Sequence, residues 1–497
     1  MATLGLADAI TDAQAWERTV DRFARDGILL PTFAQLADPS TLPPAVRAAL
    51  PKVDPDAPHP LNLFRVHWFN DETRRGIADV PGYLLLPPEL TGVRPRIAVA
   101  LGSRFPMIGA HKVLAAFGCL VPRLVTGQFD LAVDRAIWPS TGNYCRGGLA
   151  LSRILDCHGV AVLPAGMSRE RFEWLEHWVA DEADIIRTPG SESNVKEIYD
   201  ECGRLEADPH NVIFNQFSEL GNHLVHYAAT GRALEAIFAD LGGEVAGLRL
   251  AAFTSATGSA GTLAAGDYLK ERYGSKTVAV EALECPTLLY NGFGSHNIQG
   301  IGDKHVPLIH NVMGTDAVTA VSDVLTDTLY VLFQTSIGRD YLVKRRGVPR
   351  HVVDQLHELG FSGICNVLAA IKTARYYDLG EDDVIVTVAT DGGELYESEV
   401  VRLLDQRFDG HFDEVDAGET FGRAILGATV DHYQELTRVD RDRIFNLGYY
   451  TWVEQQGVSI EDFEARRDPA WWRRLHRYLD TWDALVERFD AAVAERM

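Results

Sequence analysis

Residues 109–112 read Gly109-Ala110-His111-Lys112, and an apolar run, 113–117, follows directly. The run predicts a buried helix that begins at the lysine. Lysine is mostly exposed in proteins, so its place at the start of such a helix is unusual. A partly desolvated amine is a form in which lysine can attack a carbonyl group. Taken alone, the stretch fits a surface lysine at a helix start better than a reactive one.

The chain around this lysine alternates between two patterns. Short apolar runs occur at 97–101, 160–164, 212–217, 248–254, 277–282 and 384–389. Helical patterns lie between them, at 112–120, 147–157, 169–181, 194–206, 231–241 and 262–273. Strands that alternate with helices predict βαβ units and a mostly parallel sheet. Ligands of such sheets bind beyond the carboxyl ends of the strands.

A polar turn, Ser140-Thr141-Gly142-Asn143-Tyr144, separates an apolar run from a helical pattern. Its hydroxyl and amide groups would converge on one point, as in a site for a carboxylate or a phosphate. The other interpretation is that Ser140 or Asn143 simply caps the next helix.

A second turn is rich in small residues. Residues 254–262 read Thr-Ser-Ala-Thr-Gly-Ser-Ala-Gly-Thr, and a helical pattern follows. Small residues allow backbone amides to approach phosphate oxygens at the start of a helix. No Gly-Lys-Ser/Thr follows, so the stretch is not a P-loop, and a turn without a ligand remains the alternative. A third turn, after the run 384–389, offers Thr390 and Asp391 at the end of a strand, or merely ends that strand.

Composition restricts the class of protein. The formal net charge is −23, which argues against binding to nucleic acid. No apolar run reaches the length of a membrane span, and the N-terminus lacks the pattern of a signal peptide. The six cysteines are scattered, without a C-x-x-C pair or zinc-ligand spacing. We therefore expect a cytoplasmic protein with reduced cysteines, no metal, no nucleic-acid partner and no membrane contact.

Taken in order, these stretches resemble the fold type II pyridoxal-phosphate (PLP) enzymes, the family of cysteine synthase and the tryptophan synthase β-subunit. The resemblance runs from about residue 85 to about residue 398. Besides the four stretches above, it rests on Ala165-Gly166-Met167-Ser168 with Arg169, Asn215-Gln216-Phe217, His296-Asn297-Ile298-Gln299-Gly300-Ile301-Gly302 and Phe361-Ser362-Gly363.

The resemblance implies an α/β protein of two domains, with open, mostly parallel sheets and helices on both faces. The expected segments are an N-terminal extension (1–90), a domain with the lysine and the asparagine turn (91–215), a domain with the phosphate loop (216–404) and a helical C-terminal extension (405–497). The last segment is expected to contain one long helix whose apolar face includes Trp471, Trp482 and Phe489. The family also implies a homodimer.

The resemblance also assigns roles. Lys112 would hold PLP as a Schiff base and then act as the base for the α-proton. Asn143 would bind the 3′-oxygen of the cofactor. The substrate carboxylate would be bound by Ser140, Thr141, Gly142, Asn143 and Tyr144. The phosphate would be bound by Thr257, Gly258, Ser259, Ala260, Gly261 and Thr262. Thr390 would face the pyridine nitrogen.

These roles imply β-elimination or β-replacement on a β-substituted amino acid, through an α-aminoacrylate. Two departures leave alternatives open. Tyr144 and Arg146 are bulky for the asparagine turn, and Arg146 either holds a second anion or faces solvent. The stretch after Thr390 is one residue longer than usual, so Asp391 is a second candidate for the nitrogen. An aspartate there would favour a racemase or deaminase. A non-catalytic PLP-fold binding protein and a dinucleotide-dependent dehydrogenase fit the motifs less well.

Overall fold

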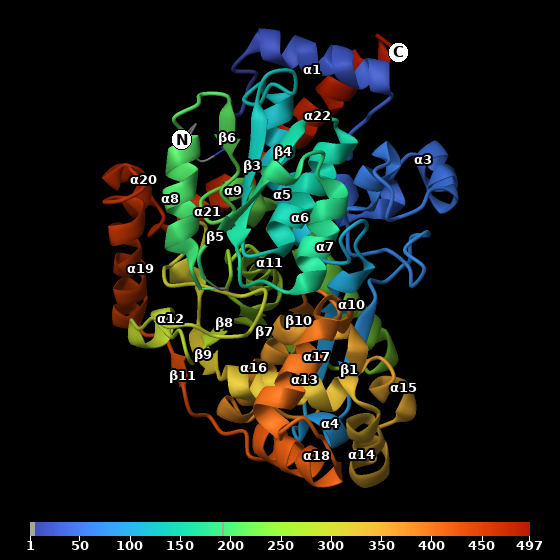
Figure 1. Cartoon of the computed structure of the whole chain (residues 1–497), viewed down its shortest axis with the longest axis vertical. Coiled ribbons are helices and arrows are strands. Elements are labelled where there is room, and N and C mark those ends of the chain that lie inside the picture. Colours follow the sequence, from blue (N-terminus) through green and yellow to red (C-terminus); the bar gives the residue numbers. More distant parts are fainter. Residues whose placement is uncertain (1–4, 191–192) are drawn as a thin grey trace.

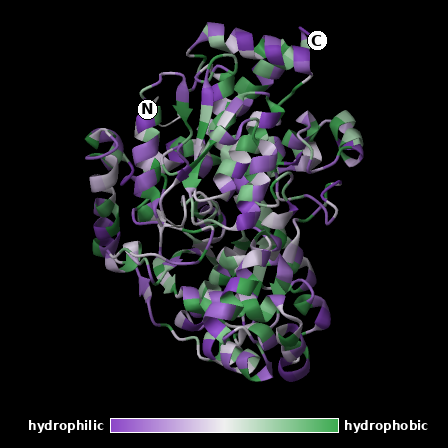
Figure 2. Cartoon of the chain, viewed as in Figure 1, coloured by the Kyte–Doolittle hydropathy of each residue, from purple (hydrophilic) through white to green (hydrophobic). Residues whose placement is uncertain are grey.

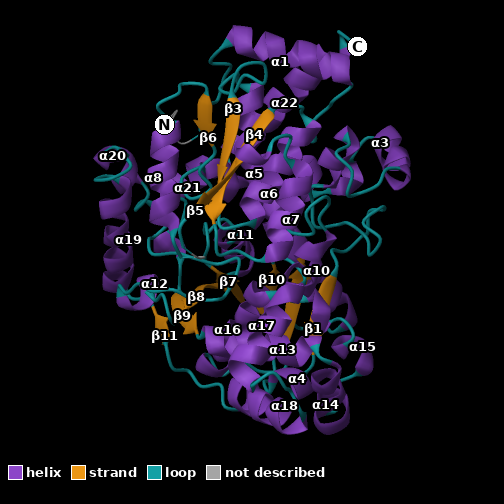
Figure 3. Ribbon diagram, viewed as in Figure 1, coloured by secondary structure: helices purple, strands orange, loops and turns teal. Residues whose placement is uncertain are grey.

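The computed structural model describes residues 5–190 and 193–497. Its strands form two separate sheets (Figures 1 and 3). The smaller sheet has the order β5-β4-β3-β6, and all its strands are parallel. Its strands are β3 (Arg135–Pro139), β4 (His158–Pro164), β5 (Ile185–Thr188) and β6 (Asn211–Ile213).

The larger sheet has the order β1-β2-β10-β7-β8-β9-β11. Its inner strands are parallel, and the edge strands β1 and β11 are antiparallel to their neighbours. Its strands are β1 (Tyr83–Leu86), β2 (Arg96–Leu101), β7 (Arg249–Ala256), β8 (Lys276–Ala282), β9 (Ala317–Val321), β10 (Asp383–Ala389) and β11 (Tyr433–Glu435). Two mostly parallel sheets with helices between their strands confirm the expected α/β fold class.

Alternate residues of β2 show why this sheet is apolar on both faces. Ala98 and Ala100 belong to one apolar core, while Ile97 and Val99 belong to a second core on the opposite face. Neighbouring side chains of a strand point to opposite faces, so a strand covered on both sides must be apolar throughout. Helices α10 (Gly231–Glu244) and α11 (Leu263–Tyr273) contribute to the first core, and α16 (Phe361–Tyr376) contributes to the second.

The remaining helices surround these two layers, and those at the surface carry both hydrophilic and hydrophobic residues (Figure 2). They are α1 (Ala13–Asp26), α2 (Phe33–Ala37), α3 (Pro44–Ala49), α4 (Pro88–Thr91), α5 (Lys112–Val125), α6 (Asn143–Ile154), α7 (Arg169–Trp178), α8 (Val195–Leu205), α9 (Leu220–Val225), α12 (Thr287–Tyr290), α13 (Asp323–Gln334), α14 (Ser336–Arg346), α15 (Arg350–Val353), α17 (Glu397–Phe408), α18 (Glu414–Phe421), α19 (Arg438–Trp452), α20 (Ile460–Ala465), α21 (Pro469–His476) and α22 (Tyr478–Ala494). Within the described ranges, no helix is both long and apolar enough to cross a bilayer.

The two extensions of the chain pack against each other and against the body. Helix α22 contacts α1, α2 and α5, and the N- and C-terminal helices lie side by side in Figure 1. Trp482 is fully buried and donates its indole N–H to the carbonyl of Ala7 at 2.9 Å. The expected single long helix at the C-terminus was wrong, because three helices occupy this stretch. Pro469 begins the second of them, where its fixed φ and missing N–H are tolerated.

Candidate active site

Lys112 lies where the two sheets meet, as the first residue of α5. The chain just before it is fixed to the carboxyl end of β10. The backbone N–H of His111 donates to the carbonyl of Thr390 at 3.1 Å, and Ala110 pairs with Asp391 in an isolated bridge. The lysine is therefore held at the edge of a parallel sheet where ligands bind in α/β folds.

The Lys112 amine is hydrogen-bonded to the small-residue loop. Its Nζ donates to Ser259 Oγ at 3.1 Å and to Gln216 Oε1 at 3.2 Å. Asn222 supports both acceptors, because its Nδ2 donates to Ser259 Oγ at 3.0 Å and to the carbonyl of Gln216 at 2.9 Å. Gln216 and Asn222 were not among the predicted site residues. Gln216 stands in a stretch that resembles the family, but its place beside the lysine depends on long-range packing.

The loop itself has the geometry of an anion cradle. Within the described part of the chain, the backbone amides of residues 258–262 donate to no protein acceptor. Ala260 has a φ of +64°, a conformation that turns successive amides toward one point, as in anion-binding nests. Helix α11 begins directly after the loop, so its positive end faces the same space. These features fit a phosphate group.

Space around the cradle is tight. A Cβ on Gly261 would lie 2.3 Å from Asn222 Oδ1, so glycine is required there. The hydroxyls of Ser255 and Thr262 pair at 2.7 Å at the base of the loop. The hydroxyl of Thr257 donates to the carbonyl of Val280 at 3.1 Å, which directs it toward the neighbouring strand.

The asparagine turn lies on the other side of the lysine, at the start of α6. Gly142 has a φ of +149°, and a Cβ there would lie 2.9 Å from the Cδ and Nε atoms of Arg171. The Oγ of Ser140 accepts from the Gly142 amide at 2.9 Å. Tyr144 is 1% exposed and donates its hydroxyl to the carbonyl of Phe214 at 3.1 Å.

A buried polar network continues from Asn143 to Asp391. Asn143 Nδ2 donates to Asp391 Oδ2 at 2.5 Å, and the hydroxyl of Tyr396 donates to the same oxygen at 2.7 Å. Arg146 Nη1 donates to Asn143 Oδ1 at 2.9 Å, and Arg171 Nη2 donates to the Tyr396 oxygen at 2.8 Å. Two arginines therefore flank one carboxylate through intermediate hydrogen bonds.

Burial dominates the electrostatics of this network. Arg146 is 2% exposed, which excludes the solvent-facing alternative for this residue. Its burial and the neighbouring Arg171 lower the pKa of Arg146 to about 10. Burial raises the pKa of the Asp391 carboxyl, while Arg171 and the hydrogen bonds from Tyr396 and Asn143 oppose that effect.

The network shows which arginine of the 165–171 stretch enters the site. Arg169 is the residue that the sequence comparison emphasised, but its side chain is 71% exposed and pairs with Glu170 and Glu173. Arg171 is fully buried. Residues two apart on a helix point in different directions, which explains the difference.

Two small adjoining hollows around Lys112 bring most of the predicted residues together. Both are lined by Lys112, Gly258, Ser259 and Gly300. The predicted residues on their walls are also Ser140, Thr141, Asn143, Tyr144, Ala260, Gly261, Thr262 and Thr390. Gly142 and Thr257 lie beside these hollows without lining them. Thr390 faces the hollow, whereas Asp391 belongs to the network behind it.

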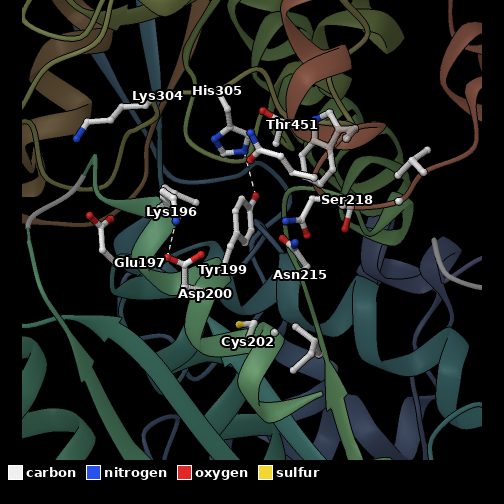
Figure 4. Close-up of a pocket in the computed structure, with 18 of the residues that line it drawn as sticks. Lys196, Glu197, Tyr199, Asp200, Cys202, Asn215, Ser218, Lys304, His305 and Thr451 are labelled. Atoms are coloured by element: carbon white, nitrogen blue, oxygen red, sulfur yellow. Dashed lines mark hydrogen bonds and ion pairs between the residues drawn. The ribbon is translucent and has the colours of Figure 1, made fainter. Parts of the chain in front are cut away.

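A cavity of about 1200 Å³ adjoins the lysine site (Figure 4). Two segments form the partition. Asn215 and Ser218 line the cavity, while the intervening Gln216 and Phe217 line the lysine hollow. In the second segment Asp303 faces the hollow and His305 faces the cavity, where Tyr199 hydrogen-bonds to it at 3.1 Å. The far walls are helix α8 and residues 451–458 of the C-terminal extension.

Comparison with known proteins agrees with this geometry. Residues 92–329 match the model of the pyridoxal-phosphate dependent enzyme family. The chain is 29% identical over 255 residues to cysteine synthase B of Campylobacter jejuni, a match that covers 50% of this chain and 74% of that protein. It is 25% identical over 232 residues to cystathionine beta-synthase of Saccharomyces cerevisiae, which covers 45% of this chain and 44% of that enzyme.

Solved structures share the fold. A cysteine synthase of Entamoeba histolytica superposes with a TM-score of 0.54 at 21% identity, over 69% of this chain and 92% of that one. A hydrogen sulfide-producing enzyme of Fusobacterium nucleatum superposes with a TM-score of 0.52 at 22% identity, over 68% and 91%. The fold is therefore that of the fold type II PLP enzymes. Over residues 92–329, just under half of its length, the chain is similar to the pyridoxal-phosphate-dependent enzymes, and PLP is its cofactor.

Proposed function

We propose that the protein catalyses β-elimination or β-replacement on a β-substituted amino acid. The observation that carries the proposal is the position of the Lys112 amine, between the anion cradle at 258–262 and the asparagine turn at 140–144. Cysteine synthases and hydrogen sulfide-producing enzymes are among the proteins of similar sequence or fold, which supports this reaction class.

The residues of the site have separate proposed roles in binding the cofactor, binding the substrate and transferring the α-proton. The five free amides and the Ser259 hydroxyl would hold the phosphate, and Lys112 would bond covalently to the cofactor. PLP supplies an electron sink that acidifies the α-proton of a bound amino acid. Ser140, Thr141 and Asn143 would bind and orient the substrate carboxylate beside Lys112. The released Lys112 amine would then accept the α-proton.

The position of Thr390 favours elimination over racemisation. Thr390 lines the lysine hollow, whereas Asp391 Oδ2 already accepts two hydrogen bonds. Thr390 is therefore the candidate that would meet the pyridine nitrogen. A hydroxyl there does not enforce protonation of the nitrogen, so negative charge at Cα would be relieved by expelling the β-substituent. A racemase or deaminase would be expected if Asp391 held this place.

The large cavity is the proposed route by which the amino acid reaches Lys112. Two short segments separate it from the lysine hollow, and its walls carry side chains of both charges, among them Lys196, Lys304, Glu197 and Asp200 (Figure 4). Such a lining suits a zwitterion. The homodimer expected from the family and the cytoplasmic location expected from the composition remain part of the proposal, to be tested by light scattering and cell fractionation.

A substrate screen tests the reaction. Purified protein should absorb visible light through the lysine-bound cofactor, and Lys112→Ala should lose that band. O-acetylserine or cysteine should shift the band and release acetate or sulfide. Exchange of the α-proton without release of a β-substituent would favour the racemase alternative. A chain that cannot be loaded with PLP would overturn the proposal.

A further inference from the structure

Three side chains from distant parts of the sequence meet outside the lysine site. His223 lies in α9, Asp267 lies in α11, and His476 ends α21 in the C-terminal extension. One potential ligand atom from each lies within 4.8 Å of the other two. Imidazole nitrogen and carboxylate oxygen are common ligands of Zn²⁺ in proteins.

The two imidazoles have the spacing of ligands on one ion. His223 Nε2 and His476 Nε2 are 3.3 Å apart. Two nitrogens bound to a tetrahedral Zn²⁺ at about 2.0–2.1 Å are separated by ~3.4 Å. The Oδ2 atom of Asp267 is 3.9 Å from His223 Nε2, so a shift of roughly 0.5 Å would bring it to the same spacing.

The outer contacts direct the ligand atoms inward. His223 Nδ1 lies 3.2 Å from the carbonyl of Ile309, which can only accept, so Nδ1 carries the proton and Nε2 presents its lone pair. Asn311 Nδ2 donates to Asp267 Oδ2 at 2.9 Å, and Glu271 Oε1 lies 3.9 Å from His476 Nδ1. Metal-bound histidines commonly make a hydrogen bond through their second nitrogen, as His223 does to Ile309.

Two members of the cluster are almost fully buried. His223 is 1% exposed and Asp267 is 8% exposed. Two imidazole nitrogens and a carboxylate oxygen therefore meet in a largely buried site. A divalent ion would satisfy all three groups.

We propose that His223, Asp267 and His476 bind a divalent transition-metal ion of the Zn²⁺ type, with water at the fourth position. The ion would fasten the C-terminal extension to α9 and α11. It would also brace the active site, because Asn222, next to His223, holds the Ser259 hydroxyl that accepts from Lys112. In the metal-free alternative, His476 Nε2–H donates to His223 while its ring stacks on Tyr227 at 3.6 Å.

Metal content and thermal stability distinguish the two arrangements. The holoenzyme is treated with a chelator, dialysed and titrated with Zn²⁺ alone. We expect one tightly bound Zn²⁺ per chain by elemental analysis and a Tm higher by a few degrees at ~100-fold excess over Kd. Mg²⁺, which prefers oxygen ligands, should not raise the Tm. An unchanged visible spectrum of PLP would show that the ion is not bound by the cofactor.

Matched variants locate the ion. His476→Gln and Asp267→Asn should each weaken Zn²⁺ binding at least tenfold and abolish the Tm shift. His158→Asn removes a histidine outside the cluster that pairs with Asp184 at 2.7 Å, and this variant should bind Zn²⁺ like the parent protein. If either cluster variant fails to fold, the other decides. Equal Zn²⁺ binding by a folded cluster variant and the parent, or no binding by the parent, would overturn the proposal.

Discussion

The side-chain amide nitrogen of Asn143, Nδ2, donates to Asp391 Oδ2 at 2.5 Å, across the junction between the two sheets. Asn143 begins α6 beside the smaller sheet, and Asp391 follows β10 in the larger one. The bond therefore couples the substrate-binding turn to the opposite layer. The orientation of the Asn143 side-chain amide is fixed from its other end as well, because Arg146 Nη1 donates to its oxygen.

We predict that Asp391 is needed for stability as well as for the shape of the site. Asp391→Ala would remove the buried carboxylate that offsets the charge of Arg146, at a cost of about 3–5 kcal/mol. Asp391→Asn keeps the acceptor for Tyr396 and should cost about 1–3 kcal/mol. Urea unfolding measures both. Asp378→Asn, at a side chain that is 95% exposed, serves as control and should change little. Equal stability of the Asp391→Ala variant and the parent would contradict the proposed electrostatic role.

A second prediction concerns the anion cradle. Gly261→Ala would place a Cβ 2.3 Å from Asn222 Oδ1 and displace the side chain that supports Ser259. We expect the affinity for PLP to fall at least tenfold, measured by titration of the visible absorbance. The control is Gly242→Ala in α10, where an added Cβ meets no atom within 4 Å. It should bind PLP normally and stabilise the helix by up to about 1 kcal/mol.

A third prediction tests the route through the large cavity. Gly203 lies in α8 on the cavity wall, and an added Cβ there meets no atom within 4 Å. Gly203→Trp should fill part of the cavity without straining the helix. The absorbance change after mixing with cysteine, followed by stopped flow, should become several-fold slower. Gly203→Ala controls for the backbone effect. An unaltered rate in the tryptophan variant would place the route elsewhere.

A fourth prediction concerns pH. Asp490 in α22 accepts the Leu30 amide at 3.1 Å, and burial raises the pKa of its carboxyl to about 7. The folded protein therefore holds this proton more tightly than the unfolded chain does, so the contribution of Asp490 to stability falls as pH rises from about 4 to about 7. Asp490→Asn keeps an acceptor for Leu30 and should raise stability by about 1–3 kcal/mol at pH 8.

The Asp490→Asn variant and the parent protein should approach equal stability as the pH falls to about 4 and below, where Asp490 becomes protonated in both the folded and the unfolded parent chain. Thermal unfolding across this range measures the difference. The control is Asp405→Asn, which changes an exposed aspartate. If the Asp490→Asn variant remains just as much more stable than the parent at pH 4, the charge of the carboxyl is not the cause of its higher stability.

The sequence predicted part of the secondary structure of the body because those patterns are local, whereas β1, β5, β9 and β11 had no predicted counterpart. Six apolar runs match β2, β4, β6, β7, β8 and β10 to within a few residues. Sheet membership is not local. Strand β2 falls within the expected N-terminal domain, yet it pairs with β10, almost 290 residues later. The expected domain boundaries therefore remain predictions that a limited-proteolysis experiment could test.

The same distinction between local and long-range features applies to the candidate site. Lys112, Asn143 and the 257–262 loop stand in contiguous motifs. Asn222, Arg171 and Tyr396 do not, because each acquires its role from a partner far along the chain. The proposed metal ligands His223, Asp267 and His476 are separated by up to about 250 residues. A search for short zinc-ligand spacings in the sequence therefore could not have found them.

The contact between the two chain ends determines when the molecule can be completed during synthesis. Ala7, Leu30 and Phe33 form hydrogen bonds to side chains of α22 that follow them by some 450 residues or more. On the ribosome, which adds about 5–20 residues per second, the first helix is made roughly 20 to 90 seconds before its partner. The apolar side of the N-terminal segment therefore stays uncovered until α22 has left the ribosome. A nascent chain that stalls before α22 would thus expose this surface to chaperones.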